Sequence, residues 1–325
     1  MPTTIEQAQS HLFDELLLIL RCLDCDARLD RDQAGALVCS ACRRIYPSTR
    51  GVARFVDERN YADSFGFQWH KFDRTQLDHD EVRESDRHFC IKTGLRPQDL
   101  KGKLVLDVGC GMGRFAEVAT RWGARVVGVD LSAAAEVAAR NLADRDFVAF
   151  QADVFSLPFA HESFDLIYSM GVLHHTPDCE KAVKVLSRFL KPGGTLAVWL
   201  YSGYNKWYRF SDIWRKYTHR MRPETLHSIL KVAVPVLYNL NRGLRAVPLV
   251  GKPVAGVIHH VFPVNRQADP EARVLDTFDW YSPKYQSKHT YEQVFRWYED
   301  MGMQDLHVAE VPISVRGRKP LQGGA

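Results

Sequence analysis

The chain has 325 residues, of which 46% are hydrophobic and 25% are charged. This composition is typical of a globular protein and excludes collagen-like, low-complexity and disordered classes. The 43 lysines and arginines exceed the 39 acidic residues by only four, a surplus too small to require a nucleic-acid partner for the whole chain. At roughly 100–200 residues per domain, the length predicts two domains.

The N-terminal residues predict a protein that is not exported. The first ten contain no lysine, no arginine and no apolar run, so they lack the features of a signal peptide. The apolar stretch at 16–20 is too short to span a bilayer. We therefore expect a cytoplasmic protein, which could lie peripherally at the inner membrane face.

Four of the seven cysteines form two CxxC pairs, Cys22 with Cys25 and Cys39 with Cys42. In a chain without an export signal, this pattern favours a metal site over disulfides. Four thiolates at this spacing suit a tetrahedral structural Zn²⁺, with an iron–sulfur cluster or an empty remnant as the alternatives. The flanks LLLILRC and LVCSACRRIYPSTRGVARFV resemble Trm112-like zinc ribbons, which predicts a zinc-ribbon domain over residues 1–60.

After a polar and aromatic segment at 61–100, residues 101–202 alternate apolar strand-like runs with amphipathic helical periods. Repeated strand–helix units predict a doubly wound α/β sheet of parallel strands, covered by helices on both faces. The strands are predicted at 103–108, 124–130, 147–153, 164–170 and 195–201.

The sharpest signal is the run Asp107-Val-Gly109-Cys-Gly111-Met-Gly113, which joins the first of these strands to a helix. Glycines let the backbone turn tightly and let a ligand approach closely. Asp130 ends the next strand, where a carboxylate can accept hydrogen bonds from a ribose diol. Dinucleotides and S-adenosylmethionine (SAM) both use such sites. GCGMG lacks the GxGxxG pyrophosphate turn, and Asp107 suits the ammonium of a methionine moiety, so SAM is favoured.

The runs DVGCGMGRF, GVD, ADVFSLPFAHESFDLIYSMGVLHH and LKPGGTLAVWLY closely resemble class I SAM-dependent methyltransferases, specifically the ubiquinone/menaquinone-type enzymes. The resemblance covers about 88–202 and, more loosely, 289–316. It implies a seven-stranded Rossmann-like sheet with SAM as the cofactor. The cofactor-binding residues that it implies are Asp107, Gly109, Gly111, Asp130, Leu131, Asp153, Val154 and Met170.

The resemblance also assigns a part of SAM to most of these residues. Asp107 and the glycines would line the methionine end, Asp130 would take the ribose hydroxyls, and Asp153 would accept a hydrogen bond from the adenine amine. A turn role for Asp153 and a core role for Met170 are the alternatives. In related enzymes an aromatic N-terminal segment closes over SAM, so we interpret 61–100 as a lid or linker with Trp69 as its candidate; ordinary packing of an N-terminal helix on the sheet is the alternative for Trp69.

His174 and His175 follow the fourth strand, where this family often carries histidines. A histidine near the methyl acceptor could take its proton, because its pKa lies near 7. A packed or capping histidine pair is the alternative. A dedicated base need not exist, because positioning of donor and acceptor dominates methyl transfer.

The resemblance requires one more helix and two strands after residue 202, and residues 289–325 supply them. Residues 203–288 are therefore a helical insertion, which in this fold overhangs the substrate pocket. Aromatic and amide side chains make the best acceptor-site candidates, with the core of a lid as their alternative role. These candidates are Tyr201, Tyr204, Asn205 and Trp280.

Residues 201–266 carry eleven lysines and arginines but two acids, Asp212 and Glu224, so this stretch alone has a net charge of +9. Its basic residues alternate with apolar runs, a composition typical of a peripheral membrane element. RNA-binding surfaces also concentrate basic residues but do not need so many valines and leucines between them. A lid with a solvated basic side is the third alternative.

Together these features predict an enzyme that transfers a methyl group from SAM to an O, N or C nucleophile. The expected acceptor is a small molecule or a glycan or lipid precursor. An rRNA base is the alternative acceptor, because some rRNA guanine methyltransferases also carry an N-terminal zinc ribbon. A non-catalytic partner-binding module is the alternative of another class, which the intact glycine turn argues against.

Overall fold

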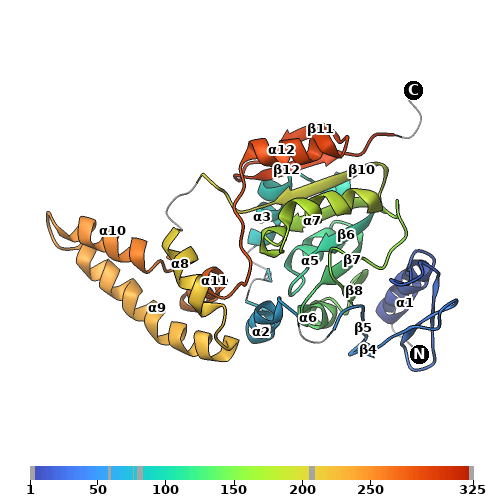
Figure 1. Ribbon diagram of the computed structural model, residues 1–325, viewed down its shortest axis with the longest axis horizontal. Helices are drawn as coiled ribbons and strands as arrows, with labels where there is room; N and C mark the ends of the chain where they lie inside the picture. Colours follow the sequence, from blue (N-terminus) through green and yellow to red (C-terminus); the bar gives the residue numbers. More distant parts are fainter. Residues whose placement is uncertain (1–3, 58–59, 76, 79–82, 205–208, 322–325) are drawn as a thin grey trace.

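The computed structural model describes residues 4–57, 60–75, 77–78, 83–204 and 209–321. At its centre lies one large sheet, whose strands follow the order β11-β12-β10-β9-β6-β7-β8-β5-β4 (Figure 1). The strands are Ser48–Thr49 (β4), Val52–Arg54 (β5), Leu104–Val108 (β6), Arg125–Asp130 (β7), Phe147–Gln151 (β8), Phe164–Met170 (β9), Leu190–Trp199 (β10), Gln304–Val308 (β11) and Ser314–Arg318 (β12).

Helices cover both faces of this sheet, and side chains alternate between the two faces along each strand. Leu106 joins a hydrophobic cluster with α1 (Thr4–Leu17), α7 (Cys179–Leu186) and α12 (Tyr291–Asp300). Its neighbour Val105 joins a second cluster with α3 (Glu84–Thr93), α5 (Arg114–Arg121) and α6 (Ala134–Asn141). The two short helices α2 (Asp63–Lys71) and α4 (Pro97–Leu100) precede β6. The result is the Rossmann-like α/β architecture that the alternating pattern predicts.

The sheet has nine strands rather than the seven expected from the resemblance. Strands β6 to β12 account for seven, and the other two come from the N-terminal region. Ala53 of β5 pairs in parallel with Phe150 of β8, and β4 pairs antiparallel with β5. An uncovered β8 would present a row of unpaired backbone groups, so this pairing protects the edge. The sheet is also mixed, because β12 runs antiparallel to both β10 and β11.

The cysteine-containing region forms a small antiparallel sheet of β1 (Leu29–Arg31), β2 (Leu37–Cys39) and β3 (Ile45–Tyr46). It has no separate core. Leu29, Leu37 and Tyr46 are buried in the same hydrophobic cluster as Phe150 and Phe159 of the main fold. Residues 1–60, which the sequence predicts as a distinct domain, therefore share a core with the large sheet and add β4 and β5 to it.

The insertion consists of α8 (Arg209–Thr218), α9 (Pro223–Arg245), α10 (Gly251–Val261) and α11 (Pro270–Tyr281). Helices α9 and α10 form a hairpin that extends away from the sheet, and α11 lies at its base (Figure 1). A third hydrophobic cluster holds this base together, with Leu230 and Val234 of α9 against Phe278 of α11. Among the helices of the described residues, none has both the length and the apolar character needed to cross a membrane.

Candidate active site

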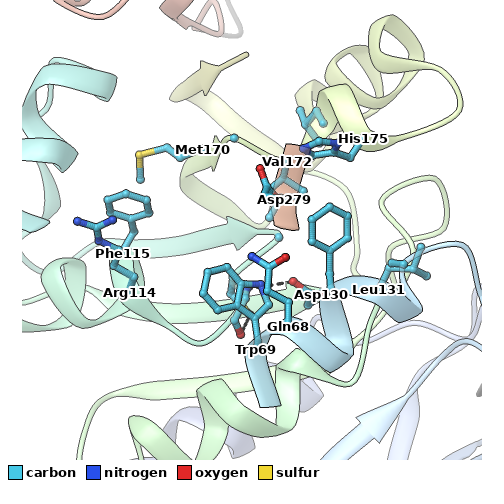
Figure 2. A pocket seen from close by; sticks show the side chains of 18 of the residues that line it. Gln68, Trp69, Arg114, Phe115, Asp130, Leu131, Met170, Val172, His175 and Asp279 are labelled. Carbon is cyan, nitrogen blue, oxygen red and sulfur yellow. Dashed lines mark hydrogen bonds between the residues drawn. The ribbon is translucent and has the colours of Figure 1, made fainter. Parts of the chain in front are cut away.

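A cavity of about 380 Å³ lies at the carboxyl ends of strands β6 to β10 (Figure 2). In doubly wound sheets this is the edge at which ligands bind. Outside the sheet, α2 and α11 supply further side chains. The residues from these elements that line the cavity include Val108, Gly109, Asp130, Ala152, Met170 and Trp199 from the sheet, Phe65, Gln68 and Trp69 from α2, and Asp276, Asp279 and Trp280 from α11.

The glycine turn leaves no room for side chains on this edge. Gly109 and Gly111 have φ of 80° and 53°, in the left-handed region that glycine adopts without strain. A Cβ on Gly109 would lie 2.3 Å from Cγ1 of Val172, and one on Gly111 would lie 3.1 Å from Nε1 of Trp69. Trp69 therefore packs directly over the turn, at the cavity wall.

Asp130 ties the end of β7 to this turn. Its Oδ2 accepts a hydrogen bond from the Gly111 amide at 3.0 Å. Its Oδ1 accepts from the amide and the hydroxyl of Ser132 at 2.9 and 2.7 Å. Burial raises the pKa of Asp130, and these three hydrogen bonds oppose the rise. A carboxylate offers about four lone-pair sites, so Asp130 retains capacity to accept from a ligand.

Asp107 lies beneath the turn rather than in the cavity. It is buried at the end of β6, and its Oδ2 accepts a hydrogen bond from the Tyr168 hydroxyl at 3.0 Å. Burial raises the pKa of Asp107 to about 8, the Tyr168 hydrogen bond opposes the rise, and the charge of Asp130 adds to it. Burial thus favours the uncharged form of this carboxyl, and Asp107 does not line the cavity.

The structure brings most of the predicted site residues together at one cavity. Those that line it are Gly109, Gly111, Asp130, Leu131, Val154, Met170, His175, Tyr201 and Trp280. Asp107, Asp153, His174 and Tyr204 do not line it, although Asp153 lies between Ala152 and Val154, which do. The side chain of Asp153 accepts from the Phe155 amide at 3.0 Å, and Asn205 lies outside the described residues.

The two adjacent histidines occupy different environments on the short turn that follows β9. His174 is fully buried and stacks on Tyr201, with ring centroids 3.9 Å apart. His175 lines the cavity, and its Nδ1 lies 3.0 Å from the carbonyl oxygen of Tyr285. A carbonyl can only accept, so the proton sits on Nδ1 and Nε2 is an acceptor. Burial lowers the pKa of His175 to about 4, and this imidazole is neutral at pH 7.

Several cavity residues were not found from the sequence. Gln68 is buried, and its Oε1 has no hydrogen-bond partner in the part of the chain that the structure describes. Lys92 and Arg114 also line the cavity, and neither forms an ion pair with a described carboxylate. The Nζ of Lys92 lies 3.8 Å from the Trp199 ring centroid. Only Arg114 carried a usable signal, because it directly follows the glycine motif at a helix start.

Comparison with known proteins identifies the family of this chain. Residues 106–198 match the family described as methyltransferase domain. A ubiquinone biosynthesis O-methyltransferase of Coxiella burnetii is 32% identical over 158 residues, which cover 47% of this chain and 68% of that protein. The chain belongs to the SAM-dependent methyltransferases. The methyltransferase is also 33% identical over 174 residues to a Brucella ovis protein of the same name, covering 51% of this chain and 67% of that protein.

Among solved structures, a SAM-dependent methyltransferase from Mesorhizobium loti aligns with this methyltransferase at a TM-score of 0.40 and 18% identity. The alignment covers 68% of this chain and 93% of that one.

The cavity of the methyltransferase fits its methyl donor. SAM carries its methyl group on a sulfonium sulfur, and this sulfur leaves readily as a neutral thioether when the methyl group is transferred. Gly109 and Gly111 line the cavity with backbone alone, because Val172 and Trp69 occupy the space that a Cβ would need, and Asp130 can accept hydroxyl hydrogens. The unpartnered Oε1 of Gln68 is a buried acceptor that a bound ligand can satisfy, and such an atom costs about 1–3 kcal/mol when left alone.

A second part of the cavity combines carboxyl groups with aromatic walls. The Tyr201 hydroxyl donates to Oδ2 of Asp279 at 2.8 Å. Burial raises the pKa of Asp279 to about 6, and burial together with the charge of Asp279 raises that of Asp276 to about 6. Trp199 and Trp280 line the same region. The methyltransferase thus offers hydrogen-bond acceptors within apolar surroundings.

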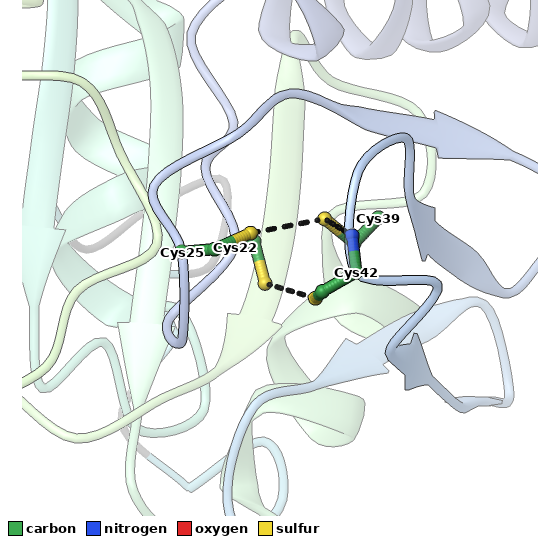
Figure 3. A group of neighbouring side chains, drawn as sticks. All are labelled: Cys22, Cys25, Cys39 and Cys42. Atoms are coloured by element: carbon green, nitrogen blue, oxygen red, sulfur yellow. Dashed lines mark hydrogen bonds between the residues drawn. The ribbon is translucent and has the colours of Figure 1, made fainter.

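The four paired cysteines of the methyltransferase converge in one cluster, and none of them lines the cavity (Figure 3). Their sulfur atoms all lie within 4.8 Å of one another, with Cys22 to Cys42 at 3.6 Å and Cys25 to Cys39 at 3.4 Å. Thiolates on a tetrahedral Zn²⁺ with bonds of about 2.3 Å would lie about 3.8 Å apart. The Tyr46 hydroxyl lies 3.2 Å from the Cys22 sulfur and accepts from the Leu23 amide, so it can donate to a thiolate.

Proposed function

We propose that the methyltransferase binds SAM across the glycine turn, with the ribose at Asp130 and the adenine between Leu131 and Val154. The contacts of Asp130 with Gly111 support this placement, because they fix the carboxylate at the strand end where a ribose diol binds. Asp153 adjoins this adenine position and would accept from its amine. The methionine end would then extend past Gly109 toward Met170.

Lys92 and Arg114 would hold the methionine carboxylate. Both are cations at the cavity wall without an ionic partner among the described residues. Burial lowers the pKa of both, to about 7 for Lys92, where the charge of Arg114 adds to the decrease and that of Asp276 opposes it. A bound carboxylate would restore the charged state of Lys92 and gain charge-assisted hydrogen bonds.

We further propose that the acceptor is a hydroxyl group on a small, largely apolar molecule. One observation carries this proposal: His175 is neutral, holds its proton on Nδ1 toward Tyr285, and has an unpartnered Nε2. An acceptor hydroxyl would donate to that nitrogen, which orients its oxygen and can receive its proton during transfer. Asp279 would assist as the ionised carboxylate that positions the Tyr201 hydroxyl.

The low pKa of His175 makes it a weak base, so we propose that it receives the hydroxyl proton only as the forming methyl–oxygen bond makes that proton acidic. The two relatives above are named as O-methyltransferases of ubiquinone biosynthesis, which supports an apolar hydroxylated acceptor. A small molecule therefore takes precedence over an rRNA base.

The test is a methylation assay with an alkyl-substituted catechol as the probe and SAM carrying an isotopically labelled methyl group. Mass spectrometry should locate the label on oxygen. His175→Ala should lower kcat by about 10²-fold or more while the dissociation constant for S-adenosylhomocysteine (SAH) stays unchanged. His161→Ala is the matched control, because His161 is exposed at the opposite end of β9. A label on a ring carbon, or an unchanged kcat in His175→Ala, would contradict the proposal.

Zn²⁺ is our proposal for the four-cysteine cluster, with a structural role. The sulfur spacing and the Tyr46 hydrogen bond support a closed tetrahedral thiolate site without an open position. Elemental analysis should give one zinc per chain, which Cys39→Ser should lose and Cys90→Ser should keep, because Cys90 lies outside the cluster. Iron, or no metal, in carefully prepared protein would exclude zinc.

A further inference from the structure

We propose that the hairpin of α9 and α10, residues 223–261, docks on the surface of a bilayer containing anionic lipids. The hairpin would hold the enzyme at a membrane surface, whichever acceptor the enzyme methylates. Three features of the hairpin support this docking: an exposed apolar stripe on each helix, an exposed apolar tip, and a set of cations with only one acid among them.

Helix α9 has two apolar sides, of which only one is packed. Leu226, Leu230 and Val234 are buried in the hydrophobic cluster at the base of the hairpin. A second set recurs at intervals of three and four residues and so shares one face of the helix. These residues are exposed, up to 68% at Val232, and they are Ile229, Val232, Val236 and Leu240. Nothing in the described part of the chain covers this face.

The tip and α10 continue the same surface. Leu249, between the two helices, is 97% exposed, and Val247 and Val250 beside it are also exposed. On α10, Val254 and Val257 follow Val250 at helical intervals, and Val257 is 64% exposed. A contiguous run of exposed valines and leucines on one protruding element is unusual for a soluble protein and marks an interaction surface.

The charges of this region identify the partner. Between 216 and 252 the chain carries seven lysines and arginines and a single acid, Glu224. None of the seven forms an ion pair with a described residue. All seven are exposed, and they are Lys216, Arg220, Arg222, Lys231, Arg242, Arg245 and Lys252. Apolar side chains flanked by cations match an interface with anionic headgroups, into which the apolar face inserts shallowly.

The same charges disfavour the other candidate occupants. A second copy of the hairpin would bring two like-charged surfaces together, because each carries the same surplus of cations. RNA would satisfy the cations but leave the exposed valines and leucines in water. An anionic bilayer satisfies both sets. At about 1.5 Å per residue, α9 measures about 35 Å, long enough to lie along a membrane surface as an interfacial helix.

Vesicle co-sedimentation of the full chain tests the proposal. Wild-type protein should sediment with phosphatidylcholine vesicles that contain a quarter phosphatidylglycerol, remain in solution with pure phosphatidylcholine, and be released by high salt. The double variant Leu249→Asp with Val257→Asp should lose binding. Replacing Lys231, Arg242, Arg245 and Lys252 by glutamine should weaken binding by roughly fivefold per charge.

Leu321→Asp is the matched control, because Leu321 is similarly exposed but lies beside Gly193 of β10, outside the hairpin. This variant should bind vesicles as the wild type does, and circular dichroism should show that all variants are folded. Failure of the wild type to sediment at low salt would overturn the proposal, as would unchanged binding by the double variant. A dimer that Leu249→Asp dissociates, or RNA binding without vesicle binding, would reassign the hairpin to those partners.

Discussion

Replacing Asp130 by alanine tests the proposed cofactor site at the residue that joins the glycine turn to β7. The change removes Oδ2, which accepts from the Gly111 amide, and Oδ1, which accepts both hydrogen bonds from Ser132. It also removes the oxygen atoms assigned to the ribose hydroxyls. We expect Asp130→Ala to fold, because the surrounding strands keep their core, and to bind SAM and SAH weakly.

The expected loss follows from the number and type of hydrogen bonds. A hydrogen bond to a charged group contributes about 1.5–3 kcal/mol when the partner would otherwise stay buried and unpaired. Since about 1.4 kcal/mol corresponds to a factor of ten, loss of the ribose contact should weaken SAH binding by roughly 10- to 150-fold. The freed Gly111 amide adds mobility to the turn, which places the effect toward the upper end of that range.

Isothermal titration calorimetry with SAH measures this loss directly. Asp146→Ala is the matched control, because it removes the same charge at a different place. Asp146 is exposed just before β8, at the opposite end of the parallel strands. Its affinity for SAH should equal that of the wild type. If Asp130→Ala binds SAH as tightly as Asp146→Ala does, the placement of the ribose at Asp130 is wrong, whatever the catalytic rate.

Three further changes probe the same cavity. Gly109→Ala should abolish SAH binding and lower the melting temperature, because its Cβ would lie 2.3 Å from Val172 and its φ of 80° is strained for alanine; a variant as stable as the wild type would refute the close packing. Activity should fall as the pH drops through about 6, because Asp279 takes up a proton there while His175 stays neutral. If Asp279→Asn shows the same loss of activity at acidic pH as the wild type, protonation of Asp279 is not the cause of that loss. The raised pKa also means that the folded state binds this proton more tightly than the unfolded state does. The contribution of Asp279 to the free energy of unfolding should therefore decrease as the pH rises from about 4 to about 6. Lys92→Met should weaken the binding of SAH but not that of 5′-methylthioadenosine, which lacks the amino-acid carboxylate. Equal losses of affinity for both ligands would refute the proposal that Lys92 binds this carboxylate.

The sequence predicted the parts of the fold that depend on local pattern. The apolar runs before and after the glycine motif predict an α/β sheet, and the comparisons confirm the SAM-dependent methyltransferase that GCGMG and Asp130 indicate. Strands β4 and β5 were not predicted. They have two and three residues, too few to show a period of two, and they form only because the edge of β8 offers unpaired backbone groups.

The remaining cavity residues depend on contacts between segments far apart in the chain. Gln68 on α2 and Lys92 on α3 line the cavity from helices without any recognisable motif. His174 and His175 could not be told apart from the sequence, because adjacent residues of a short turn point in different directions and only packing decides which one meets the cavity. The shared core of the cysteine region was equally hidden, since Leu29 and Leu37 look like the inner residues of an independent ribbon.

The insertion connects the cavity wall that α11 forms to the hairpin. Phe278 of α11 is buried against Leu230 and Val234 of α9, while its neighbours Asp279 and Trp280 line the cavity. Because a packed core transmits displacement rather than absorbing it, a force on α9 reaches the α11 residues that line the cavity. A hairpin held at a lipid surface would therefore fix the orientation of α11, and with it the cavity wall. The glycine turn and Asp130 belong to the sheet and would keep their geometry in either state.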